Sequence, residues 1–259
     1  MIAKFSLLAL LVVVASASPV TQDTSMVNYG EAVEMFLDAW KKMLPCGYAP
    51  DNIPVMAPLT VDFYAFDYNN GETNIVGNVS NIRISGLNNF QVLSGSFNPN
   101  TLRSTYDVLY PEIQIFGSYE VEGVISIAGF PVPIRQSVLI NKKLTDWRFV
   151  GDYTFAQSLS NSNGLRISDF NLHYFVGDVK VDNWDKYLDI AANNYFNDIF
   201  GSFSLLFTQE IQPYIKPFYG KYVLPSINNM LSNLSLTQLA DYFASQAEIW
   251  NNAGCAVQS

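Results

Sequence analysis

The stretch from Ile113 to Ile127 alternates apolar and more polar side chains for longer than an ordinary strand does. Every second position holds an apolar residue or a glycine: Ile113, Ile115, Gly117, Tyr119, Val121, Gly123, Ile125 and Ile127. Alternation with a period of two marks a strand with one buried face and one wetter face. Ordinary strands run about 5–6 residues. This strand, or this pair of strands with a bend at a glycine, therefore needs a long apolar partner along one face.

The strand pattern extends over the whole region from Val61 to about Val181. Turn residues at Tyr68–Gly71 and Asn161–Gly164 separate segments of this region from one another. No helical pattern intervenes between these segments. The sequence therefore predicts that consecutive strands pair in an antiparallel meander.

Helical periodicity flanks the strand region on both sides. Residues 26–44 carry apolar side chains at helical spacing, and Pro45 should end that helix. Residues 185–211 form a second, aromatic-rich pattern that would span roughly 40 Å as a helix. Shorter helices are expected over 219–231 and 237–251. The order predicts an α+β fold in which a long curved antiparallel sheet wraps around a long C-terminal helix, with an N-terminal helix in addition.

The first residues have the form of a secretory signal peptide. Lys4 precedes the apolar run Phe5–Val14, and Ala15–Ala17 has the form of a cleavage site. A membrane anchor is the alternative, but the run falls short of the roughly 20 residues that a span needs. We therefore expect residues 1–17 to be removed and the protein to be secreted and extracellular.

The composition is apolar and weakly charged. Charged residues make up 14% of the chain, apolar residues 49%, and the formal net charge is −9. About 25% charged residues is usual, so the surplus apolar surface must fill a large core or line an internal cavity. The acidic balance argues against nucleic acid and an anionic membrane surface as main partners. No later stretch is apolar enough to span a bilayer, and no stable membrane insertion is expected.

Covalent modification is expected at four positions. Cys46 and Cys255 are the two cysteines, and in an exported protein one disulfide between them is the default prediction. Two separate thiols remain the alternative. Asn78 and Asn233 each begin an N-x-S glycosylation triplet, although such triplets also arise by chance.

Residues that could carry catalysis are few. His173 is the single histidine, so a metal site built from histidines is excluded, and an ordinary strand histidine is expected. Glu120 and Glu122 lie on the wetter strand face, which favours solvated surface over a glycosidase pair. A metal site is conceivable, but helix N-termini favour acidic residues anyway; its ligands would be Asp178, Asp182, Asp185 and Asp189. We expect no catalytic residue, no metal and no cofactor, and a secreted hydrolase is the weakest hypothesis.

Three short motifs resemble those of a known family. The stretch from Tyr110 to Ile125 resembles the central strand of the insect haemolymph juvenile-hormone-binding and takeout-like proteins. Residues 84–90 and the helix start at 194–196 fit the same family, and group 7 mite allergens share its general fold. The resemblance implies one domain over residues 18–259 and an apolar space between sheet and helix that binds a lipid-like ligand. The cysteines depart from the pattern, because takeout-like proteins usually carry a close pair near the mature N-terminus.

The leading hypothesis is a secreted, monomeric carrier of a small hydrophobic ligand such as a terpenoid, a fatty acid or a similar lipid. An apolar tunnel between sheet and helix would hold the ligand. The alternative is an extracellular interaction or surface-recognition protein with a filled core and no small ligand. The predicted lining comes from two strands and the long helix: Ile113, Ile115, Tyr119, Val121, Trp147, Phe149, Tyr153, Phe155, Tyr195, Phe196, Ile199, Phe200 and Phe203.

Overall fold

The computed structural model describes residues 28–69, 71, 73–127, 130–182, 190–210 and 212–254. The predicted leader and Cys255 lie outside the described residues. None of the described helices is both long enough and apolar enough to cross a bilayer.

A seven-stranded antiparallel sheet forms the centre of the molecule. Its main path runs β1-β2-β4-β5-β6, while β3 pairs with β4 and β7 pairs with β5. The strands are β1 (Leu59–Asn69), β2 (Asn74–Ser85), β3 (Gln91–Asn98), β4 (Arg103–Ile127), β5 (Phe130–Gln157), β6 (Leu165–Phe175) and β7 (Asp178–Val181). The alternating stretch that opens the sequence analysis lies wholly within β4, which is 25 residues long. The predicted antiparallel arrangement of consecutive strands is confirmed.

The helices lie before and after the sheet in the chain. They are α2 (Tyr29–Met43), α3 (Ile190–Glu210), α4 (Gln212–Phe218), α5 (Leu224–Leu231) and α6 (Leu236–Ala253). A π-helical turn, Tyr219–Val223, joins α4 to α5 and begins two residues after Pro217. A proline within a helix removes a backbone hydrogen bond, and such a π-turn is one way in which a helix continues past the disturbance.

Local sequence explains where two of these helices begin. The side chain of Asn28 accepts a hydrogen bond from the backbone N–H of Glu31 at the start of α2. At the start of α6, Ser235 and Gln238 form a reciprocal capping box. Both devices satisfy backbone N–H groups that the first helical turn leaves without partners.

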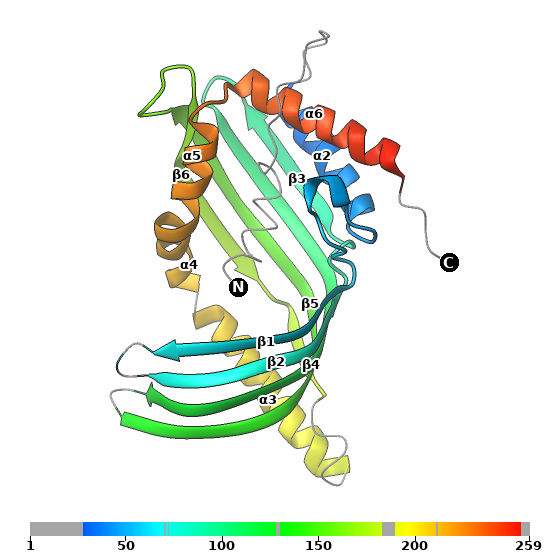
Figure 1. Cartoon of the computed structure of the whole chain (residues 1–259), viewed down its shortest axis with the longest axis vertical. Coiled ribbons are helices and arrows are strands. Elements are labelled where there is room, and N and C mark those ends of the chain that lie inside the picture. The colour runs from blue at the N-terminus through cyan, green and yellow to red at the C-terminus, as the bar shows by residue number, and fades with distance from the viewer. Residues whose placement is uncertain are drawn as a thin grey trace.

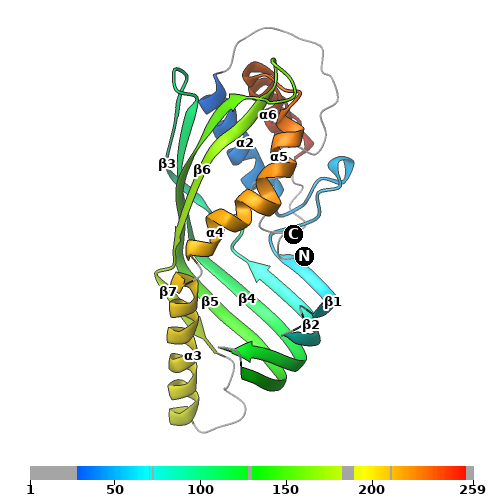
Figure 2. The same ribbon diagram turned by 90° about the vertical axis from the view of Figure 1, so that its left-hand side faces the viewer.

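The sheet bends midway along β4 and β5 and uses a different face in each half. Its upper half packs against α2, α5 and α6, whereas the lower half turns away from them (Figure 1). In Figure 2, α2 and α6 lie to the right of the upper strands, and α3 lies to the left of the lower ones. The fold class, an α+β chain with a long antiparallel sheet, an N-terminal helix and a C-terminal helical region, is confirmed.

The main core lies between the upper half of the sheet and the pair α2–α6. Phe36 of α2 contacts both Phe243 and Trp250 of α6, with ring centroids 5.0 and 4.9 Å apart. Ala32 and Ala247, one from each helix, are completely buried. Small residues at these positions let the two helices approach closely while the aromatic rings interlock between them.

Two side-chain amides attach the C-terminal helices to β6, the edge strand. Asn228 of α5 accepts from the Ile167 N–H at 2.7 Å and donates to the Ile167 carbonyl at 3.2 Å. Gln212 of α4 accepts from the Tyr174 N–H and donates to the Leu172 carbonyl at 3.0 Å. Each amide supplies the donor and acceptor that a further strand would have provided. The edge is thereby closed to pairing with another chain along these positions.

The long helix α3 packs on β7. Gly201 permits the contact, because a Cβ there would stand only 2.5 Å from the Val179 carbonyl oxygen. Val179 and Val181 of β7 are both buried. The helix therefore covers the lower sheet at its β7 side.

Candidate ligand-binding site

One face of the lower sheet is apolar across four neighbouring strands. Cross-strand partners share a face, as do residues two apart in one strand. Three rows of partners run across β1, β2, β4 and β5. We call these twelve residues the lower sheet face: Tyr64, Val79, Tyr119 and Val138; Phe66, Gly77, Val121 and Gln136; Tyr68, Ile75, Gly123 and Ile134.

The side chains of the lower sheet face are for the most part half-buried, and Tyr68 and Gln136 are exposed. Over the described residues, the helices make their main contacts with β3, β6 and β7, and none of these strands contributes to this face. An apolar surface of this extent is a candidate for binding an apolar partner.

Glycines shape this surface where aromatic rings cross it. A Cβ at Gly77 would stand 2.8 Å from Cζ of Phe66, so the ring lies over the glycine. Gly123 has a φ of +148°, and a Cβ there would also overlap the backbone of Asn74. Glycine at these two positions therefore lets the Phe66 ring and the backbone of β2 approach more closely than a side chain would allow.

A polar pair lies within the apolar face. The Tyr119 hydroxyl donates to Oε1 of Gln136 at 3.0 Å. Burial raises the pKa of Tyr119, so the phenol is neutral at physiological pH. The Tyr119 oxygen can still accept a hydrogen bond, and the Gln136 amide nitrogen can still donate one. The pair could orient the polar end of an otherwise apolar molecule.

The two predicted isoleucines of β4 lie above the lower sheet face. Ile113 pairs with Leu144, which in turn pairs with Val179 of β7, and it is only 1% exposed. Ile115 is half-buried between Ile84 and Lys142. These rows connect the lower sheet face to the strand on which α3 packs.

The predicted aromatic residues of β5 belong to the upper half of the sheet. The hydroxyls of Tyr153 and Tyr29 are 2.7 Å apart, and the ring of Phe155 lies 5.5 Å from that of Tyr29. Trp147 and Phe149 contact each other at 4.7 Å near the lower limit of the same core. The structure thus places Tyr153 and Phe155 against α2, and it places Trp147 beside Phe149 rather than on the lower sheet face.

Sequence reasoning missed Tyr110, which joins Trp147 and Phe149 in the upper core. Its ring lies 6.0 Å from Trp147 and 5.9 Å from Phe149, and burial raises its pKa to about 12. Tyr110 has the opposite parity from Ile113 in β4, so the alternation of residues 113–127, extended back to Tyr110, would place it on the wetter face. The upper half of β4 buries the other set of alternate residues, which Tyr106 also shows by packing against the core.

The predicted residues of α3 are spaced three or four apart along that helix or are neighbours in it, which is the spacing of one helical side. Tyr195 and Ile199 are exposed and line a shallow groove of about 360 Å³ together with Asp198, Ser202 and Leu206. The side chains of Phe196, Phe200 and Phe203 lie outside the described part of the structure. The shared enclosure of helix and strand residues that the sequence predicts therefore stays a prediction.

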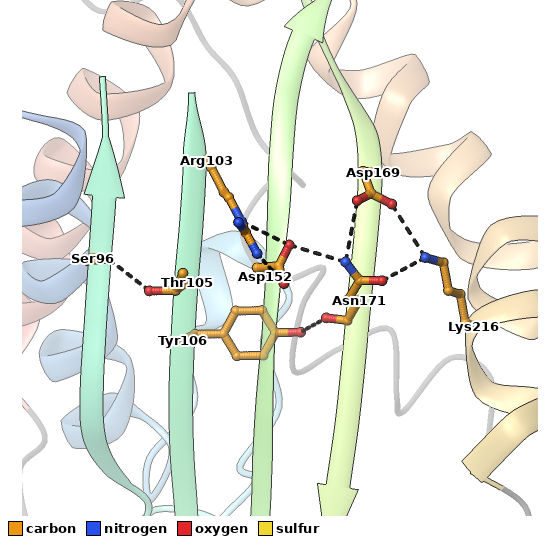
Figure 3. A network of polar contacts seen from close by, with 8 residues as sticks. All are labelled: Ser96, Arg103, Thr105, Tyr106, Asp152, Asp169, Asn171 and Lys216. Atoms are coloured by element: carbon orange, nitrogen blue, oxygen red, sulfur yellow. Dashed lines mark hydrogen bonds and ion pairs between the residues drawn. The ribbon is translucent and has the colours of Figure 1, made fainter. Parts of the chain in front are cut away.

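A polar network links β4, β5, β6 and α4 in the upper half of the sheet (Figure 3). Arg103 pairs with Asp152 at 3.1 Å, Asn171 donates to the same carboxylate, and Lys216 donates to Asn171 at 2.6 Å. Burial opposes ionisation of Asp152, but the hydrogen bonds from Arg103 and Asn171 outweigh it and lower the pKa. The network members bind one another, which indicates a role in holding the strands together.

The polar residues considered for catalysis lie at the surface. His173 is exposed, and so are Glu120 and Glu122, which contact Asn78 and Arg135 respectively. Within the described ranges, no group of three or more His, Cys, Asp or Glu residues could hold a metal ion. Asp185 and Asp189 lie outside those ranges.

The candidate modification sites differ in their surroundings. Cys46 follows α2 and is not free, and it shares a surface cavity of about 430 Å³ with Gly254, the residue before Cys255. Because Cys255 itself is not described, the pairing stays a prediction. Asn78 is half-buried in β2, whereas Asn233 is exposed between α5 and α6 and is the more accessible of the two sequons.

Comparisons with known proteins identify relatives across most of the chain. The family model described as haemolymph juvenile hormone binding protein (JHBP) matches residues 6–241. Takeout 1 of Epiphyas postvittana is similar at 14% identity and a TM-score of 0.39, over 85% of this chain and 93% of that one. A lipopolysaccharide binding protein is similar at 9% identity and a TM-score of 0.34, over 77% of this chain and 40% of that one. No curated protein sequence matches the chain.

Proposed function

The chain belongs to the haemolymph juvenile hormone binding protein family, and from this premise we propose that it is a secreted carrier of a small hydrophobic ligand. The resemblance that the sequence motifs suggested is confirmed by the family match. The ligand is a terpenoid, a fatty acid or a similar lipid, the carrier acts as a monomer in extracellular fluid, and it performs no catalysis.

The lower sheet face is the observation that supports this proposal. It offers apolar side chains from four strands, most of them half-buried rather than fully enclosed. A ligand lying along the face would remove both its own apolar surface and that of the half-buried side chains from water. Burying about ten methylene groups contributes roughly 8 kcal/mol before the entropic cost of association, at about 0.8 kcal/mol per group. Micromolar affinity therefore requires no charged anchor.

The Tyr119–Gln136 pair gives the site its polarity. A neutral phenol and an amide can hydrogen-bond to an uncharged polar group, such as an ester, an epoxide or a protonated acid. A charged side chain at this place would lose more hydration free energy when such a ligand covered it. The rest of the face selects by shape alone, so related ligands of similar length should bind with similar affinity.

A pair of matched variants tests where the ligand binds. Val121→Lys places a charge in the middle of the lower sheet face. Val76→Lys places the same charge in the neighbouring strand but on the opposite face, where Val76 pairs with Glu122 and is exposed. Titration of the mature protein with a fluorescent fatty acid should show that Val121→Lys lowers the affinity at least roughly tenfold, which corresponds to about 1.4 kcal/mol of binding free energy. Val76→Lys should bind as the wild type does.

Two results would contradict the carrier proposal. Equal loss in both variants would place the ligand elsewhere, provided that circular dichroism shows both to be folded. Failure of the wild type to bind any apolar probe would favour the alternative, an extracellular interaction protein with a filled core.

A further inference from the structure

Exposed aromatic side chains run along one side of the helical segment from Gln212 to Leu231. Tyr214 is 72% exposed, Phe218 is 38% exposed and Tyr222 is 56% exposed. They are spaced four residues apart, so they lie about one helical turn from each other. The rings of Phe218 and Tyr222 are in contact, with centroids 5.2 Å apart. We call these three residues the aromatic stripe.

The opposite side of the same segment is fixed to the core. Val223 and Ile227 are buried, and Tyr219 stacks on Phe170 of β6 with ring centroids 5.4 Å apart. Figure 1 shows α4 and α5 along the outer margin of the upper strands, beside β6. The amides of Gln212 and Asn228 attach both ends of the segment to that strand. The aromatic stripe is therefore held rigidly outward, and little conformational entropy would be lost when a partner covers it.

The charge of the segment is opposite to that of the whole chain. Residues 212–231 include Lys216 and Lys221 but no aspartate or glutamate, in a chain whose formal net charge is −9. The Lys221 ammonium lies 4.9 Å from the ring centroid of Tyr222. Lys216 reaches Asp169 at 3.4 Å, whereas Lys221 contacts the stripe itself.

From this combination we propose that the aromatic stripe docks the protein on the surface of a phospholipid bilayer. Tyrosine and phenylalanine rings are favourable at the level of the lipid head groups, where the hydroxyls stay wet and the rings reach apolar atoms. Lysines beside them attract head-group phosphates. Three side chains give weak, reversible attachment, which suits a protein that leaves the membrane again.

The acidic net charge limits this docking in a measurable way. At about 0.15 M salt the Debye length is about 8 Å, so only charges near the docked side act on the membrane. At about 0.01 M salt it reaches about 30 Å, and the negative charge of the whole molecule then opposes an anionic surface. Binding to anionic vesicles should therefore weaken at low salt, whereas attachment through a basic cluster alone would strengthen.

Flotation of the mature protein with vesicles tests the proposal. The vesicles contain phosphatidylcholine, with or without phosphatidylserine, and no carried ligand is added. The wild type should float with both. The double variant Tyr214→Ser/Tyr222→Ser should lose at least about tenfold in partitioning, because it removes two of the three rings. Phe63→Ser is the matched control, since Phe63 is 63% exposed on β1 of the lower sheet, and it should partition as the wild type does.

The outcomes distinguish docking from the carrier function. The proposal is supported if the double variant keeps its thermal unfolding curve and its affinity for the fluorescent fatty acid but no longer floats. It is overturned if the wild type does not float, or if Phe63→Ser loses as much as the double variant. It is also overturned if the double substitution converts a wild-type dimer to a monomer in sedimentation, since a second copy would then cover the stripe.

Discussion

Asn228 binds the backbone of Ile167 through both atoms of its side-chain amide, accepting from the N–H at 2.7 Å and donating to the carbonyl at 3.2 Å. An asparagine on a helix thus takes the place of a strand at the edge of the sheet. Since Ile167 is itself buried, loss of the amide would leave two backbone groups without partners away from water.

Replacement of Asn228 by leucine should therefore destabilise the protein by about 1–3 kcal/mol, the usual cost of unsatisfied buried polar groups. Urea unfolding followed by circular dichroism measures the change. Asn229→Leu is the matched control, because Asn229 is the exposed neighbour in the same helix. Equal losses in the two variants would show that the bonds to Ile167 contribute nothing special.

Gly151 should not accept a side chain. Tyr106 crosses this glycine to donate to the Asn171 carbonyl at 3.1 Å, and a Cβ at Gly151 would stand 2.5 Å from the Tyr106 hydroxyl oxygen. Gly151→Ala should cost about 1–3 kcal/mol through this overlap. Gly95→Ala, directly across from Tyr106 on β3, should cost far less, because the nearest atom would be 3.8 Å away. The urea midpoints of the two variants test this prediction, and equal midpoints would contradict it.

Stability should fall in acid partly through Asp107. Arg148 donates two hydrogen bonds to this carboxylate, at 2.8 and 2.5 Å, and they lower its pKa. A carboxyl whose pKa falls on folding contributes fully above its unfolded pKa of about 3.9 and loses that contribution as the pH drops through its folded pKa. In urea titrations at several pH values, Asp107→Asn should flatten the loss below about pH 4. A profile for Asp107→Asn that falls in acid as steeply as that of the wild type would contradict the assignment.

Cys46 and Cys255 should form one disulfide in the secreted protein. Cys46 and Gly254 line the same surface cavity, so the residue that precedes Cys255 lies near Cys46. In the chain-entropy model, closing a loop of about 210 residues by this disulfide stabilises the folded state by about 4–5 kcal/mol. Non-reducing peptide mapping should give one crosslinked pair, and Cys46→Ser should lower the unfolding midpoint. Two thiols that alkylate in the folded protein would refute the linkage.

The order of elements could be predicted from the sequence because period and turn chemistry act locally. Alternation in 113–127 and helical spacing in 26–44 each correspond to a single element of the structure. The face that each half of β4 buries could not be predicted. Tyr110 and Ile113 are both enclosed although their parities differ, because α2 and α6 cover one half and α3 reaches the other.

The candidate site was predicted only in part for the same reason. Tyr119 and Val121 were found through their alternation in β4, and both lie on the lower sheet face. Tyr64 and Phe66 were missed, because β1 carries aromatic residues at both parities and its sequence does not show which set is covered. Which side chains share one face of the sheet depends on the register between strands. That register is set by pairing with residues far away in the chain, so the sequence of one strand does not show it.

The single register that β4 and β5 keep, from Arg103 opposite Thr154 to Ile127 opposite Phe130, restricts how such a chain can change in length. Deleting one residue from the lower half of β4 would turn every later side chain of that strand to the other face and place glutamates where the lower sheet face now has tyrosine and valine. Tolerated insertions and deletions within these strands should therefore come in steps of two residues, or as matched single changes in both strands at the bend. Changes of any length should be confined to the connecting loops.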